Sequence, residues 1–233
     1  MNIQPQTYLV QRAILAPDLG GHTSDLRGWD DPAWQHAETA EVAYFYPQSS
    51  DHHPHTRVRL LYDRSGIHGI FQVQDQYVRC LHSGYLEDVW QDACVEFFVK
   101  PKPTAGYFNF EMNCGGALLS YYIVDPTPVL DAFVDYMPLP PEDGHQVLIR
   151  TTLPAIVDPE IATPVTWTLQ FFVPFALLEK YVGPLGNVAG QEWRANFNKC
   201  AHNNSHPHWA SWNPLPEFNF HYPQGFGVIR FAA

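Results

Sequence analysis

Carboxylate and amide side chains recur at every second position along two neighbouring segments of the chain. Glu96 lies on the first segment, and Asn109, Glu111 and Asn113 lie on the second. Trp90 comes shortly before the first of them. Ligand pockets combine apolar and aromatic walls with a few polar groups that fix orientation. Sugars need this combination, since their hydroxyls bind polar groups and their C–H faces stack on a ring. The pattern predicts a non-catalytic site for a mono- or oligosaccharide.

A third polar row strengthens this interpretation. Arg194, Asn196 and Asn198 alternate with Ala195 and Phe197, so Asn196 joins the candidate ligand-binding residues. Such rows are also typical of the solvent-facing side of an antiparallel sheet, which needs no ligand. Asparagine is depleted in strands, however, and amides in the middle of strands therefore favour a site over a plain polar face.

The polar segment 202–212 contains two tryptophans, Trp209 and Trp212. Loops carry function more often than the scaffold that supports them. The two rings either cap an edge of the domain or line a ligand site, and both are retained as candidates.

Histidines give the main alternative, a haem- or metal-binding domain, because imidazole suits zinc, copper, nickel and haem iron. Pro207 prevents a single helix from aligning the histidines around it, and no cysteine or aspartate completes a ligand set. Solvated loop histidines are the competing interpretation. The histidines concerned are His52, His53, His55, His202, His206 and His208.

A second alternative is a glycoside-active enzyme, with Glu96 and Glu111 as its acid and base. Such pairs stand about 5 Å apart, or roughly 6.5–9.5 Å apart, depending on the stereochemical course. Their separation is not set by the sequence. The chain has no G-x-S-x-G elbow, P-loop or Rossmann glycine pattern, so those chemistries are unsupported.

Charge and composition limit the partners. With 24 acidic and 13 basic residues the formal net charge is −11, which argues against nucleic acid and against an anionic membrane surface. No apolar run reaches the roughly 18 residues of a membrane span, and no basic-then-apolar signal opens the chain, so a cytoplasmic location is the default expectation. The four cysteines show no C-x-x-C spacing and are expected to be buried, reduced thiols.

Period-two alternation predicts many strands and a single short helix at 174–181. The fold class is therefore all-β: one antiparallel β-sandwich or jelly-roll domain over residues 1–233, with long loops and at most one or two short helices. The long loops are expected at 17–35, 47–56, 125–145 and 201–224. The strands are expected at 57–62, 67–74, 93–100, 107–113, 165–173, 193–200 and 227–231.

With these segments in place, the chain resembles the family 9 carbohydrate-binding modules, within the wider DOMON-like β-sandwich group. The most specific similarity is the Trp-x-Asp-x-x-Val-Glu core of residues 90–96. Further similar segments are 31–37, 59–75, 196–200 and 220–227.

The resemblance implies that a sugar end sits between two tryptophans. Trp90 is then one wall, Trp212 the second wall with Trp209 as the alternative, and Glu96 a hydroxyl acceptor. The resemblance also places polar contacts on the strand of Asn109 and Glu111. Two departures from the family pattern are Asn at position 109 instead of Arg, and Ala93 instead of a second Asp. A structural calcium ion is compatible with the family, with no ligands assigned here.

Overall fold

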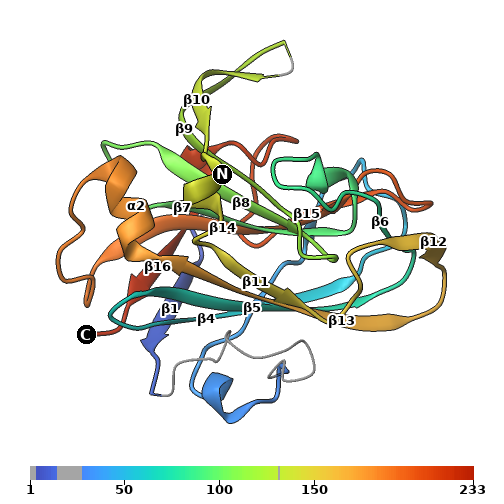
Figure 1. The fold of residues 1–233 in the computed structure, drawn as a ribbon, viewed down its shortest axis with the longest axis horizontal. Helices are drawn as coiled ribbons and strands as arrows, with labels where there is room; N and C mark the ends of the chain where they lie inside the picture. The colour runs from blue at the N-terminus through green and yellow to red at the C-terminus, as the bar shows by residue number, and fades with distance from the viewer. Residues whose placement is uncertain (1–3, 15–27, 131) are drawn as a thin grey trace.

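Two β-sheets stacked face to face form the body of the protein in this computed structural model, which describes residues 4–14, 28–130 and 132–233 (Figure 1). The first sheet runs in the order β10 (Ala132–Pro138), β9 (Leu118–Val129), β8 (Tyr107–Asn113), β7 (Cys94–Lys100), β14 (Glu192–Ala201) and β16 (Gly227–Phe231). The second runs β4 (His55–Tyr62), β5 (Gly66–Asp75), β13 (Val165–Pro174) and β11 (Leu148–Thr151).

Strand β1 (Thr7–Arg12) joins the two sheets, and it departs from the all-antiparallel expectation. Its first half pairs in parallel with β16, and its last two residues pair in parallel with β4. The remaining short elements are β2 (Ala40–Glu41), β3 (Tyr44–Phe45), β6 (Val78–Cys80), β12 (Val157–Ile161), β15 (His208–Ser211), α1 (Pro141–Gly144), α2 (Phe175–Val182), and the 3-10 turns η2 (Pro32–Trp34), η3 (Val89–Gln91) and η4 (Pro223–Gly225).

The main core fills the space between the sheets. Successive side chains of a strand point to opposite faces, so alternate residues of each strand enter the core. Phe97 of β7 packs against Phe171 of β13 with ring centroids 5.5 Å apart, and Phe71 of β5 meets Phe197 of β14 edge-on at 6.2 Å. The expected β-sandwich class is confirmed, and each predicted strand is present with bounds shifted by two residues or fewer.

The segment 125–145 was expected to be a loop, and that expectation is wrong. Strands β9 and β10 form a long hairpin that projects from the sandwich, followed by α1 (Figure 1). Beyond Ile123, β9 pairs only with β10, so the hairpin tip has no strand on its other sides. Proline is tolerated at such edges because its missing N–H faces away from the partner strand. Pro126 and Pro128 of β9 and Pro138 of β10 lie in this hairpin.

Two smaller expectations, on the helix and on the cysteines, are confirmed. The helix predicted at 174–181 is α2, which starts at Phe175 with Pro174 as its N-cap residue. All four cysteines are buried and unpaired by disulfides, as expected of core thiols. No helix in the described part of the chain is long and apolar enough to cross a membrane. The loop expected at 17–35 lies largely outside the described residues.

Candidate functional site

A pocket of about 730 Å³ lies on the outer face of the first sheet, away from the main core. Its floor is made by β7, β8 and β9, and its walls come from η3, β15, the loop after β14, the hairpin strand β10 and the segment 218–221. The lining residues are Asp88, Trp90, Gln91, Glu96, Asn109, Glu111, Leu119, Tyr121, Phe133, His202, Trp209, Phe218, Asn219, Phe220 and His221.

Strand register brings the polar side chains of the floor together. Glu96 of β7 stands directly opposite Glu111 of β8, and Asn109 of β8 stands opposite Tyr121 of β9. The neighbours of these residues along each strand, such as Phe97 and Phe110, are fully buried in the main core. Because the side chains alternate, burial of one set turns the carboxyl and amide groups to the outer face.

Hydrogen bonds hold the floor in a fixed geometry. Asn109 Nδ2 donates to Glu111 Oε1 at 2.8 Å, and Asn198 Nδ2 donates to Glu96 Oε2 at 3.1 Å. The Cys200 thiol donates to Glu96 Oε1 at 3.2 Å. Each carboxyl group is therefore oriented by a neighbour before any ligand arrives, which lowers the ordering cost of binding.

Burial makes the two carboxyl groups unusually basic, and repulsion by Glu96 adds to this effect at Glu111. Glu96 is 2% exposed and Glu111 is 4% exposed. Desolvation raises the pKa of both groups well above the ordinary value, and the facing carboxyl raises the pKa of Glu111 further. The pair therefore retains protons at pH values where exposed glutamates are ionised, and it can both donate and accept hydrogen bonds.

The aromatic walls are organised around His202. Its ring lies edge-on to Trp90 at 4.6 Å and to Trp209 at 4.9 Å, between centroids. The indole Nε1 of Trp209 donates to His202 Nε2 at 2.6 Å. An indole N–H is only a donor, so Nε2 accepts and the ring proton of neutral His202 resides on Nδ1. Burial lowers the pKa of His202 to about 4, which keeps the ring neutral at pH 7.

His221 closes the opposite side of the floor. Its Nδ1 is 2.8 Å from Tyr107 Oη, and its Nε2 is 3.9 Å from Glu111 Oε1. The ring also lies 4.6 Å from that of Phe133, which the projecting hairpin contributes. Burial lowers the pKa of His221 to about 3, so this side chain too is uncharged at neutral pH.

Five of the eight ligand-binding candidates from the sequence line this one pocket: Trp90, Glu96, Asn109, Glu111 and Trp209. The other three lie outside it.

Asn113 Nδ2 donates to Asp92 Oδ2 at 2.8 Å beneath η3, and Asn196 exchanges hydrogen bonds with Asn213. Trp212 is 3% exposed and packs on Phe197, with ring centroids 5.2 Å apart. Trp212 directly follows the end of β15 at Ser211, and its ring belongs to the main core, whereas Trp209 packs against the separate cluster beneath the pocket. The structure thus places Trp209, not Trp212, in the pocket with Trp90.

Several pocket residues were not expected from the sequence. Leu119 and Tyr121 alternate with buried residues of β9 as the other floor strands do, and the same period-two pattern could have identified them. Phe133 had no such signal, because its hairpin was expected to be a loop. The aromatic run Phe218–His221 was visible in the sequence, but only the folding of its segment over the sheet brings it to the pocket.

Metal-binding options are limited in the described part of the chain. One group of three donors lies close together there: Cys94, Glu96 and Cys200, whose ligand atoms fall within 4.8 Å of one another. All three are buried, and the Cys200 thiol already donates to Glu96 and lies 3.5 Å from the Trp90 carbonyl oxygen. We assign no ion to this group, because its polar atoms satisfy one another.

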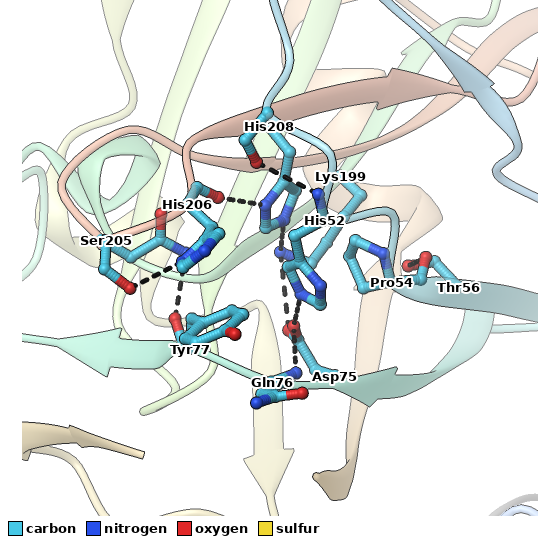
Figure 2. A network of polar contacts seen from close by, with 12 residues as sticks. His52, Pro54, Thr56, Asp75, Gln76, Tyr77, Lys199, Ser205, His206 and His208 are labelled. Carbon is cyan, nitrogen blue, oxygen red and sulfur yellow. Dashed lines mark hydrogen bonds and ion pairs between the residues drawn. The ribbon is translucent and has the colours of Figure 1, made fainter. Parts of the chain in front are cut away.

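The histidines of the haem or metal alternative do not converge on one point. His52 and His208 meet edge-on at 5.2 Å in a network with Asp75 and Lys199, and His206 lies 6.4 Å from His52 between ring centroids (Figure 2). His202 instead lines the pocket. Lys199 Nζ lies 2.8 Å from His208 Nε2. An ammonium group at this nitrogen leaves no lone pair for a metal ion.

The glycosidase alternative requires two carboxyl groups that flank a scissile bond. Glu96 and Glu111 instead lie side by side on one sheet face and contribute to the same floor. A ligand in the pocket meets both groups from one side. This arrangement suits hydrogen bonding to hydroxyl groups of one ring.

Comparisons with known proteins identify the family and a shared fold. The sequence model of carbohydrate-binding family 9 matches residues 34–231. A proposed carbohydrate-binding protein from Bacteroides uniformis has a similar structure, with a TM-score of 0.81 and 25% sequence identity over 98% of this chain and 100% of that one.

Structures of a family 9 module from Caldicellulosiruptor kristjanssonii share the fold at 12% identity. The complex with glucose has a TM-score of 0.62 and covers 97% of this chain and 95% of that one. The complex with cellotriose has a TM-score of 0.63 and covers 97% and 94%. No curated protein matches the sequence significantly.

Proposed function

This chain belongs to carbohydrate-binding family 9, and we propose that it binds sugar in the pocket between Trp90 and Trp209. Its function is carbohydrate binding without covalent chemistry. The observation that carries the location is one arrangement: two partly buried tryptophans, each edge-on to His202, line the same pocket above a floor of hydrogen-bonded carboxyl and amide groups.

Each part of the pocket has a role in this proposal. The indole faces of Trp90 and Trp209 stack against the C–H faces of a sugar ring. Glu96, Glu111 and Asn109 bind its hydroxyl groups, and their existing hydrogen bonds keep them oriented. Neutral His202 offers Nδ1–H as a further donor, since Nε2 is already occupied by Trp209.

The pocket favours neutral over acidic sugars. None of its lining residues is lysine or arginine, and two of them are buried glutamates. A sugar carboxylate or sulfate would find no cationic partner there, and an unpaired buried charge is costly. Glucose and cellotriose, which the Caldicellulosiruptor kristjanssonii module binds, are the first ligands to test.

Calorimetric titration with glucose and cellotriose tests the site. We expect Trp90→Ala to weaken binding about tenfold or more, since removal of a large buried contact surface costs about 1.5–3 kcal/mol. Trp90→Phe should retain part of the affinity because a ring remains. Tyr44→Ala is the matched control, since it removes an exposed aromatic residue outside the pocket.

Unchanged affinity in folded Trp90→Ala would remove this pocket from consideration. Equal losses in Trp90→Ala and Tyr44→Ala would indicate a general effect of aromatic substitution, and would also contradict the assignment.

A further inference from the structure

The pocket carries acidic groups without any matching cation. Asp88, Glu96 and Glu111 line it, and the lining includes no lysine or arginine. Both of its histidines are neutral at pH 7, because burial lowers the pKa of His202 to about 4 and that of His221 to about 3. When these carboxyl groups ionise, no cationic side chain in the lining balances their charge.

Glu111 is the clearest case. Two charged groups raise the pKa of its carboxyl group, and both are acidic. They are Glu96, which stands opposite it on β7, and Asp88. Its other neighbours are uncharged: Asn109 donates one hydrogen bond, His221 lies 3.9 Å away, and Tyr107 and Tyr121 hold phenol groups nearby. Lys199, which lowers the pKa of Glu96, lies on the opposite face of the sheet and is fully buried.

The aromatic walls also suit a cation. Trp90, Trp209, Tyr121 and Phe220 surround this floor. The faces of such rings attract ammonium groups, most strongly where water is excluded. Floor and walls therefore share a preference for positive charge on the ligand.

We propose that the pocket prefers a sugar with a protonated amino group to its neutral counterpart, with the ammonium bound beside Glu111 and Glu96. This inference rests on the proposed function, and it names the class of sugar that the same site takes. The ammonium supplies the positive charge that the carboxyl pair lacks, while the rest of the ring uses the stacking and hydroxyl contacts already described.

The size of the preference follows from the kind of hydrogen bond. A hydrogen bond to a charged group contributes about two times as much as one between neutral groups. The gain corresponds to roughly five- to tenfold in affinity. The ammonium also stabilises the ionised form of Glu111, whose proton is released as the ligand binds.

Calorimetry on the unmodified protein tests this directly, with glucosamine, glucose and N-acetylglucosamine as probes. The pH is kept below the pKa of the glucosamine amine. Glucosamine should bind about five- to tenfold more tightly than glucose. N-acetylglucosamine, which carries a neutral group at the same carbon, should lose this advantage. Repeating the titrations in two buffers of different ionisation enthalpy should reveal proton release with glucosamine and not with glucose.

Glu111→Gln is the matched variant, since it keeps size and one acceptor oxygen but removes the charge. Within this variant glucosamine and glucose should bind with equal affinity, whatever the substitution does to the affinity for glucose itself. Equal affinities for glucosamine and glucose in the unmodified protein would overturn the inference and leave the proposed function intact. A glucosamine preference that survives in folded Glu111→Gln would also overturn it. Failure of all three sugars and of cellotriose to bind would instead refute the proposed function.

Discussion

Replacement of Lys199 by methionine removes the buried ammonium group from the network that it forms with Asp75 and His208. Lys199 is fully buried, and its ammonium donates to His208 Nε2 at 2.8 Å and to the Cys200 carbonyl at 3.0 Å (Figure 2). It also lies 3.8 Å from Asp75 Oδ2. The network ties β14 and β15, which carry the Trp209 wall, to β5 of the other sheet.

The expected loss follows from what the substitution leaves behind. Removing one partner of a buried ion pair usually costs about 3–5 kcal/mol, because the other charge stays buried. Asp75 retains three donors: His52 Nε2 at 2.8 Å, Trp167 Nε1 at 3.2 Å and the Gln76 N–H at 2.8 Å. We therefore expect the lower end, about 3 kcal/mol, and a fall in Tm of roughly 6–12 °C for a chain of this length.

Urea unfolding of Lys199→Met, Asp75→Asn and the double variant measures this loss. The double variant removes both charges, so it should be more stable than the sum of the single losses predicts, by at least about 1 kcal/mol. Lys199→Gln, which retains a donor, should lose less than Lys199→Met.

A loss below about 1 kcal/mol in Lys199→Met, or strictly additive losses in the double variant, would refute the reasoning. Either result would mean that the ammonium and the carboxylate do not depend on each other in the folded protein.

Three further predictions concern the pH dependence of stability and the two tryptophans Trp209 and Trp212. Burial alone would raise the pKa of Asp75, but Lys199 and His52 lower it to about 2, below the unfolded value. The contribution of ionised Asp75 to the free energy of unfolding is therefore fully present above about pH 4 and is lost as the pH falls towards 2, by about 2 kcal/mol. Unfolding free energies measured at a series of acidic pH values should show this loss, and Asp75→Asn should lack it. Trp212→Phe should lower the free energy of unfolding by about 1–3 kcal/mol while sugar affinity stays within about twofold, because its ring lies in the core. Trp209→Ala should weaken sugar binding much more than it lowers stability, and the reverse pattern would contradict the placement of the two rings.

Alternation within strands was readable without the structure. Phe97 and Phe110 alternate with Glu96 and Glu111 in the sequence, and the structure places the phenylalanines in the core and the glutamates in the pocket floor. This succeeds because successive side chains of any strand point to opposite faces, whichever strand lies beside it. The sandwich class followed from the same local rule, applied to many short strands with turns between them.

Local sequence patterns could not decide which of the two tryptophans lines the pocket. Trp209 and Trp212 are equally compatible with a polar loop, and the resemblance favoured Trp212. Pairing of β15 with β14 and β3 decides which ring faces outward, and a pairing register is a property of two strands far apart in sequence. The same holds for Phe133, which reaches the pocket only because residues 118–138 form a hairpin.

The sequence by itself determined the fold class, the buried face of each strand and the chemical character of the site, because these depend on residue type and on a two-residue period. Only the tertiary structure decided which groups meet: that Glu96 faces Glu111, that Trp209 shares the pocket with Trp90, and that residues 218–221 line it too. The physical reason is that these contacts join segments distant in the chain. Their positions follow from packing and register between strands, which no local pattern specifies.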